Sequence, residues 1–257
     1  MRDNPLRKTL MQGGVISGVM AQEFATDGFP AITAAAGAEF IVYDLEHTGW
    51  SLETLKRMVA AGCGASAIPL VRVPVNDYHH IAHSLDCGVC GVVLPMVNTP
   101  AELTTALDAA YYPPLGRRGC SFGLMHDGYL SVDLKEMMRH ANENLLVVAQ
   151  IESREGVEHA ETLCGDPRVH AIWIGHYDLS CSLGAPGDFT TAEYKAAVER
   201  VLRLCRQNNK AAVLGSSDPV ALVGGIVSGY RMLVYTSDHQ IYSRAVRECM
   251  TKIRSEQ

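Results

Sequence analysis

Eight short apolar runs recur along the chain, and segments with helical spacing of apolar residues separate them. The runs carry apolar side chains at successive positions, which is typical of strands covered on both faces rather than of half-exposed strands. Strands that alternate with helices predict β-α-β units and a parallel sheet. The eight predicted strands span residues 15–20, 40–43, 68–73, 91–94, 145–151, 171–175, 211–214 and 232–235.

The segments between the runs supply the helices that such a sheet requires. Residues 111–144 form the longest interruption, and we expect an elaborated loop there, after the fourth strand, on the face where barrels hold their active sites. The predicted helices span residues 29–37, 52–62, 78–86, 101–110, 155–163, 192–207, 219–228 and 240–254.

The strand count decides between two architectures. Eight parallel strands close into a (β/α)8 barrel, which typically takes about 250 residues, and the chain has 257. An open doubly wound sheet is the rival, but no GxGxxG motif follows the first strand. Hydrophobic residues make up 47% of the chain and charged residues 19%, and no linker divides it. We therefore predict a single TIM barrel over residues 1–257.

The charge of the chain and its apolar runs exclude several classes of protein. The net charge is -6, with no basic stripe to neutralise phosphates, which argues against a nucleic-acid partner. The N-terminus lacks the apolar region of a secretory leader, and no run of about 18 apolar residues predicts a membrane span. We expect a cytoplasmic protein that acts on small molecules.

Eight cysteines in a chain of this kind predict reduced thiols. Cys87 and Cys90 form one C-x-x-C pair, but no second pair exists for a zinc site. The pair also precedes a strand instead of opening a helix, as a redox motif would. We interpret these cysteines as structural.

Two neighbouring strands are followed by carboxylates. Glu152 comes directly after the strand at 145–151, and Asp178 comes shortly after the strand at 171–175. Because neighbouring parallel strands lie about 4.8 Å apart, carboxylates at their C-terminal ends can meet at one cation. The simpler interpretation is that each acid caps the helix that follows it. We interpret the two as a metal pair because both lie where α/β folds place ligands.

Polar residues also follow the second and third strands. Asp44, Glu46 and His47 come after the second strand, and Arg72 lies at the end of the third. Arg72 has apolar neighbours, so its charge requires a buried anion, and a bound carboxylate or enolate is suitable. His47 is either a structural histidine or a general base whose tautomer a carboxylate holds.

These motifs resemble those of the HpcH/HpaI aldolase family, the metal-dependent pyruvate aldolases related to citrate lyase, such as 4-hydroxy-2-oxoheptanedioate aldolase. The likeness runs from about Gly13 to Val246. Its most specific motifs are DLEH at 44–47, RVP at 72–74, LPMVNTPAE at 94–102, YPPLGRRG at 112–119, QIESREG at 150–156 and DLS at 178–180.

The resemblance implies a (β/α)8 barrel and a role for each matching residue. Glu152 and Asp178 would hold a divalent ion, Mg²⁺ or Mn²⁺ with Co²⁺ as a third choice. Arg72 would contact the keto oxygen of pyruvate, His47 and Asp44 would handle protons, and Asp86 would support the histidine. The residues expected to contact the substrate are Arg72, Gln150, His176, Tyr177, Asp178 and Leu214.

The implied reaction is the reversible aldol cleavage of a 4-hydroxy-2-oxo acid to pyruvate, or a related 2-oxo acid, and an aldehyde. The metal stabilises the enolate, so no Schiff-base lysine is required. Two alternatives stay open. One is an oxo-acid lyase, decarboxylase or CoA-thioester lyase on the same metal site, with Arg117 and Arg118 as the nearby basic residues for nucleotide phosphates. The other is a metal-binding relative without turnover.

The chain departs from the family beside the metal acid and near the eighth strand. His176 and Tyr177 replace the usual Pro-Ala pair, and residues 234–238 replace a Gly-Val-Asp pattern. If the strand continues that far, alternation puts His176 and Asp178 on one side, facing the metal. We expect His176 and Tyr177 to influence substrate choice. The alternative is a structural histidine with a core partner.

Two apolar stripes near the C-terminus predict assembly. Family resemblance indicates that the last helix packs on a neighbouring subunit, giving a homo-oligomer, either a dimer or a hexamer. The alternative is a helix that closes its own barrel. The stripes consist of Leu222, Val223, Ile226 and Val227, and of Ile241, Ala245, Val246, Met250 and Ile253.

Overall fold

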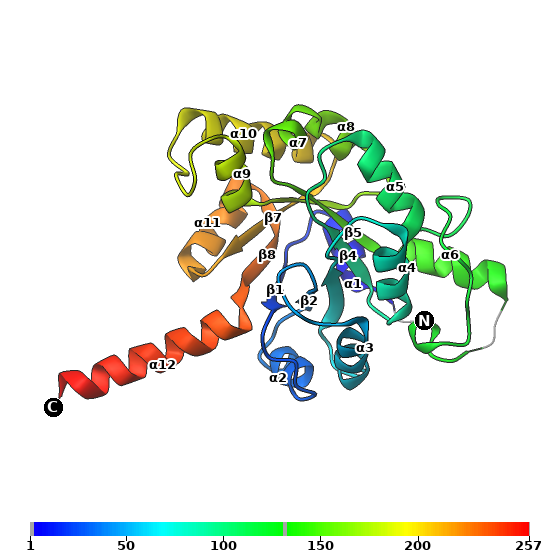
Figure 1. Cartoon of the computed structure of the whole chain (residues 1–257), viewed down its shortest axis with the longest axis horizontal. Coiled ribbons are helices and arrows are strands. Elements are labelled where there is room, and N and C mark those ends of the chain that lie inside the picture. Colours follow the sequence, from blue (N-terminus) through cyan, green and yellow to red (C-terminus); the bar gives the residue numbers. More distant parts are fainter. Residues whose placement is uncertain (1–2, 131–132, 257) are drawn as a thin grey trace.

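The computed structural model describes residues 3–130 and 133–256, and its centre is a closed barrel of eight parallel strands (Figure 1). Each strand pairs with its sequence neighbours, and β1 pairs with β8 to close the barrel. Each of the eight predicted runs overlaps one strand, so the barrel prediction is confirmed. The strands are β1 (Ile16–Ala21), β2 (Phe40–Asp44), β3 (Ile68–Arg72), β4 (Gly91–Leu94), β5 (Leu146–Ile151), β6 (Ala171–Ile174), β7 (Ala211–Ser216) and β8 (Tyr230–Ser237).

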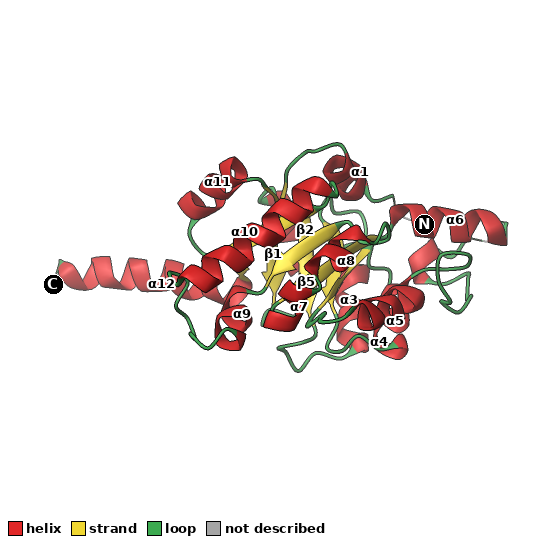
Figure 2. Cartoon of the chain, turned by 90° about the horizontal axis from the view of Figure 1, so that it is seen from above, coloured by secondary structure: helices red, strands yellow, loops and turns green. Residues whose placement is uncertain are grey.

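Helices follow the strands and surround the barrel, as Figure 2 shows. The single helix predicted at 155–163 is two helices, α7 and α8, which meet at His159. Helices α1, α6 and α9 are additional to the predicted set. The helices are α1 (Pro5–Met11), α2 (Phe29–Ala35), α3 (Leu52–Ala61), α4 (Tyr78–Asp86), α5 (Pro100–Ala110), η1 (Met125–Asp127), α6 (Leu134–Asn144), α7 (Arg154–Glu158), α8 (Ala160–Gly165), α9 (His176–Ser182), α10 (Ala192–Gln207), α11 (Pro219–Ser228) and α12 (Asp238–Ser255).

The buried residues form two layers. One layer fills the interior of the barrel with side chains from all eight strands, among them Phe40, Leu70 and Trp173. Leu6 and Leu10 of α1 belong to the same layer, so this helix closes the N-terminal mouth of the barrel. The second layer lies between the strands and the surrounding helices. The open end of the barrel is therefore the C-terminal end of the strands.

Residues 111–144 do not lie on the active-site face, so the prediction of their position is wrong. The segment follows helix α5, not strand β4, and leads into β5. A helix after a parallel strand returns the chain to the N-terminal edge of the sheet, so the segment lies on the face opposite the strand-end acids. Its contacts agree, because Arg118 bonds Asp86 at the end of α4, and the backbone oxygen of Asn142 accepts a hydrogen bond from Arg7 of α1.

Helix α12 projects away from the barrel (Figures 1 and 2). Its first residue is anchored, because the Asp238 carboxylate accepts hydrogen bonds from the backbone N–H groups of residues 22–24. Further along, Tyr242, Val246, Met250 and Ile253 are exposed. The alternative that this helix closes its own barrel is therefore wrong for the single chain. No helix in the described part of the chain combines the length and the apolar character that a membrane span needs.

Candidate active site

Asp44 and Arg72 are the last residues of β2 and β3, and the strand register places them side by side. The guanidinium donates two forked hydrogen bonds to the carboxylate, from Nε to Oδ1 at 2.9 Å and from Nη2 to Oδ2 at 2.6 Å. Both side chains are buried. The buried anion that the sequence requires for Arg72 is thus a residue of the protein itself.

The pair stays charged although it is buried. Burial opposes the charge on Asp44, but the hydrogen bonds and positive charge of Arg72, together with hydrogen bonds from Gln22 and the Glu46 backbone, outweigh it and lower the pKa of this carboxyl. For Arg72, burial favours the neutral form, yet the bonds and charge of Asp44 raise the guanidinium pKa. Gln22 adds a bond from Nε2 to Asp44 Oδ2 at 2.7 Å. Gln22 directly follows β1, so the strand-end rule applied to the first strand would have found it.

Glu46 and His47 continue the chain after β2. Glu46 Oε2 lies 3.2 Å from Arg72 Nε and 3.6 Å from His47 Nε2, so this acid stands between the guanidinium and the imidazole. The His47 side chain is 59% exposed, which places it at the solvent side of the group. Burial raises the pKa of Glu46, and the charges of Asp44 and Asp178 raise it further against the opposing effect of Arg72. Glu46 has no assigned role in the sequence prediction, yet the structure places it between Arg72 and His47.

Glu152 is buried directly after β5. Its Oε1 accepts a hydrogen bond from Met96 N at 2.7 Å, and its Oε2 accepts one from Gln150 Nε2 at 2.6 Å. The carboxylate lies against Gly175, where a Cβ atom would fall 2.2 Å from Oε2. Glycine at position 175 therefore leaves the space that the carboxylate occupies.

Asp178 lies in the first turn of α9 and completes a group of acids. Burial raises the pKa of Glu152, and the charges of Glu46 and Asp178 raise it further against the bonds from Met96 and Gln150. The carboxylates of Glu46, Glu152 and Asp178 are thus close enough to repel one another. Arg72 is their positively charged neighbour.

This donor set fits a divalent cation. Within residues 3–130 and 133–256, no group of three or more His, Cys, Asp or Glu side chains is arranged to hold a metal ion. A hard cation such as Mg²⁺ needs only one or two protein carboxylates when water and substrate oxygens supply the rest. Glu152 and Asp178 can serve as such a pair, because a cation would relieve the repulsion among the three acids.

A cleft of about 600 Å³ opens over these residues at the C-terminal end of the barrel. Asp44 and Glu152 are buried beside Arg72 and Gln150, which line it. Trp173, Phe189 and Tyr194 also line the cleft, and no sequence signal predicts the last two, because they come from the loop and helix after α9. The sequence-predicted residues in its lining are His47, Arg72, Gln150, His176, Tyr177, Asp178 and Leu214.

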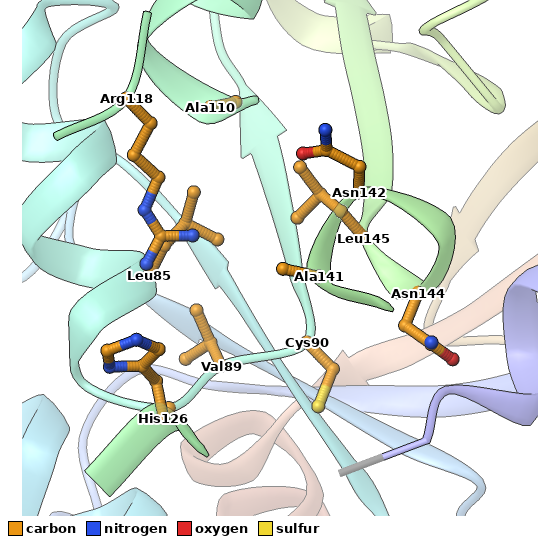
Figure 3. A pocket seen from close by; sticks show the side chains of 11 residues that line it. Leu85, Val89, Cys90, Ala110, Arg118, His126, Ala141, Asn142, Asn144 and Leu145 are labelled. Carbon is orange, nitrogen blue, oxygen red and sulfur yellow. The ribbon is translucent and has the colours of Figure 1, made fainter. Parts of the chain in front are cut away.

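Asp86 is the predicted site residue that the single chain does not bring to the cleft. It ends α4, at the opposite end of the barrel, and its Oδ1 accepts a hydrogen bond from Arg118 Nη2 at 2.6 Å. Figure 3 shows Arg118 and His126 beside a small pocket of about 40 Å³ near this end. Within one chain, Asp86 therefore does not contact His47 and cannot support it as the sequence predicts.

His176 takes a different position from the one that strand alternation predicts. Strand β6 ends at Ile174, and His176 is the first residue of helix α9, so the alternation argument does not apply. Its Nδ1 forms a short hydrogen bond with the hydroxyl of Tyr194, and its Nε2 is buried without a partner. Burial lowers the pKa of His176. The residue has both the core partner of the structural alternative and a place in the cleft lining.

Comparison with known proteins agrees with this fold and shows the family. The family model for HpcH/HpaI aldolase/citrate lyase matches residues 26–229. A hydroxypyruvate/pyruvate aldolase of Chromohalobacter salexigens is 33% identical over 189 residues, which cover 74% of this chain and 74% of the relative. A 2-keto-3-deoxy-L-rhamnonate aldolase of Klebsiella pneumoniae is 26% identical, with coverage of 98% and 94%. The crystal structure of an HpcH/HpaI aldolase from Desulfitobacterium hafniense has a TM-score of 0.93 at 24% identity, with coverage of 98% and 97%.

Proposed function

Because this chain belongs to the HpcH/HpaI aldolase/citrate lyase family, we propose that it catalyses the reversible aldol cleavage of a 4-hydroxy-2-oxo acid, with the help of a divalent metal ion. The products are pyruvate, or a related 2-oxo acid, and an aldehyde. The observation that carries the proposal is the arrangement of Arg72 and the acids Glu46, Glu152 and Asp178 around one cleft. A 2-oxo acid reacts through an enolate, whose negative charge would be stabilised by a cation held by these acids and by the positive charge of Arg72.

Glu152 and Asp178 would hold the cation, which we propose to be Mg²⁺ or Mn²⁺. When bound, such an ion stabilises the negative charge that develops on the keto oxygen during enolate formation. Arg72 lines the cleft and keeps its positive charge through Asp44, so it supplies a fixed donor toward the same oxygen. Gln150 lines the cleft beside Glu152 and orients both that acid and the bound oxo acid.

His47 is the residue in the cleft that we propose to move the proton. Its side chain lines the cleft, and Glu46 Oε2 lies 3.6 Å from its Nε2, so this acid can orient the imidazole toward the substrate. In synthesis His47 would take a proton from C3 of the oxo acid. In cleavage it would take the proton of the 4-hydroxyl group. The described residues that line the cleft include no lysine, so a Schiff-base route has no nucleophile there.

The test separates metal use from folding. Wild-type protein freed of metal should not exchange the C3 protons of pyruvate with deuterated water in an NMR assay, and added Mg²⁺ or Mn²⁺ should restore the exchange. Glu152→Gln and Asp178→Asn should reduce exchange by about 100-fold or more and weaken Mn²⁺ binding measured by electron paramagnetic resonance. Circular dichroism should show an intact fold in both variants. Full exchange in metal-free protein contradicts the metal mechanism.

The CoA-thioester alternative has less support from this geometry. Its basic candidates, Arg117 and Arg118, lie in the segment between α5 and α6, at the other end of the barrel from the acids. Arg117 pairs with Asp108, and Arg118 pairs with Asp86. Neither residue lines the cleft, so nucleotide phosphates bound there would not meet them.

We also propose that the chain forms a homo-oligomer through α12. This helix carries exposed apolar side chains and leaves the barrel after its second turn, where Tyr242 packs on Phe24 and Arg244 bonds Ser217. Beside its start lies an apolar groove of about 850 Å³, lined mainly by residues of α2, β1 and α12. Contiguous apolar surface of this kind is typical of an interface between subunits. A neighbouring copy that covers the helix and groove accounts for both.

A further inference from the structure

The part of the cleft away from Arg72 has an aromatic wall, which consists of His176, Tyr177, Phe189 and Tyr194. The ring centroid of Phe189 lies 5.4 Å from that of Tyr177 and 5.3 Å from that of Tyr194. The His176 ring packs at 6.2 Å from Phe189 and is held by its hydrogen bond to the Tyr194 hydroxyl. These contacts fix the wall as one packed unit between α9 and α10.

The rest of this end of the cleft is uncharged. Trp173, Leu214 and Val234 add apolar surface from strands β6, β7 and β8. The polar side chains near them are hydroxyls and amides, among them Ser216 and Gln240. An aldehyde that reacts beside Arg72 and Asp178 can place its chain against these surfaces.

Positive charge is scarce in the cleft. Of the described residues that line it, Arg72 is the only Arg or Lys, and Asp44 and Glu46 already surround it. The two imidazoles, His47 and His176, are not permanent cations.

Arg244 lies near the rim of the cleft but does not line it. Its Nη1 donates to the backbone oxygen of Ser217, and its guanidinium lies over the Tyr235 ring at 5.3 Å. Glu248 is 3.9 Å from its Nε and offsets its charge. A second carboxylate on the substrate therefore meets no dedicated cation among the described residues that line this end.

We propose that the aldehyde partner of this enzyme is uncharged and carries an apolar or aromatic chain. The inference rests on the proposed aldolase function and adds the class of acceptor. Bringing an unpaired carboxylate into the cleft costs free energy, whereas an aromatic or alkyl chain gains contact with the aromatic wall. The products of synthesis are accordingly 4-hydroxy-2-oxo acids with one carboxylate and an apolar tail.

A matched pair of aldehydes tests the charge. Butanal and 4-oxobutanoate have the same number of carbon atoms and differ in one terminal carboxylate. With pyruvate and Mn²⁺ fixed, we expect kcat/KM for butanal to exceed that for 4-oxobutanoate at least about tenfold, a difference of about 1.4 kcal/mol. Phenylacetaldehyde should react at least as well as butanal.

Pyruvate exchange separates the two ways in which this experiment can fail. If C3 exchange is absent with metal present, the proposed function itself is wrong. If exchange occurs but 4-oxobutanoate equals or exceeds butanal, or neither aldehyde condenses, the acceptor proposal is wrong and the function stands.

Substitutions at Phe189 test the wall, because this loop residue is partly exposed and its replacement should leave the barrel folded. Phe189→Ala should lower the ratio of phenylacetaldehyde to acetaldehyde kcat/KM about tenfold, and Phe189→Leu should lower it less. Phe189→Arg adds a cation and should raise the ratio of 4-oxobutanoate to butanal. Unchanged ratios in all three variants overturn the role of the aromatic wall.

Discussion

Gly175 lies directly against Glu152, so that a Cβ atom at position 175 would stand 2.2 Å from Oε2 and 2.6 Å from Cβ of the acid. Glu152 follows β5, Gly175 follows β6, and these strands pair through Ile151 and Ile174. The absence of a side chain at one strand end thus sets the position of the acid at the next.

The first prediction is that Gly175→Ala displaces Glu152. The added methyl group cannot fit without moving the buried carboxylate, so Mn²⁺ affinity should fall about tenfold or more and thermal stability should decrease. Isothermal titration calorimetry and thermal unfolding measure the two effects. Gly165→Ala is the matched control, because a Cβ at position 165 would have no atom within 4 Å apart from its chain neighbours and the backbone of its own helix. Equal metal affinity in both variants would show that the contact is unimportant.

The second prediction concerns the forked bond between Arg72 and Asp44. Arg72→Lys keeps the charge but loses the planar donors that match the carboxylate. Pyruvate C3 exchange should fall about 100-fold. Because Asp44 is buried and would keep its charge with a poorer partner, the variant should also unfold at a lower temperature. Arg57→Lys serves as a control for an exposed ion pair, and it should change neither measurement.

The third prediction is a pH dependence of stability that arises from His170. The residue is buried, its Nδ1 accepts a hydrogen bond from Val147 N at 3.0 Å, and burial lowers its pKa to about 3. The unfolded chain, with a pKa of about 6.5, therefore binds a proton below that pH while the folded chain does not. Stability from this group is full above about pH 6.5 and is lost as the pH falls toward 3.

Denaturant unfolding at fixed protein concentration measures this loss. Between pH 8 and pH 5, wild type should lose about 2 kcal/mol more than His170→Asn, which keeps an acceptor but cannot take up the proton. The control is His79→Asn at an exposed histidine, which should behave as wild type. The same pH dependence in wild type and His170→Asn would rule out His170 as the source.

The fourth prediction is that α12 holds the assembly together. Light scattering at micromolar concentration should show an oligomer for wild type. Val246→Asp with Met250→Asp should shift it toward monomer, because charges replace exposed apolar side chains of the helix. Lys252→Asp places a charge change on the same helix without removing apolar surface, and it should perturb assembly less. A monomeric wild-type protein contradicts the proposal.

Much of the fold and part of the site follow from local pattern. The apolar runs determine the eight strands, and parallel strands place their C-terminal residues at one edge of a barrel. For this reason Arg72 and Glu152 come together as the sequence predicts, with Asp44 as the partner of Arg72, and Asp178 joins them from the first turn of α9. The same rule would have supplied Gln22, which follows β1.

The sequence by itself thus determined the barrel and the acids at its mouth, because both depend on periodicity and on the ends of strands. The tertiary structure decided where the side chains of His176 and Asp86 lie and where helix α12 runs. His176 opens a helix and bonds Tyr194, Asp86 lies with Arg118 at the far end, and α12 leaves the barrel. Each of these depends on contacts between segments distant in the chain, and local hydrophobic pattern carries no information about which distant side chains will meet.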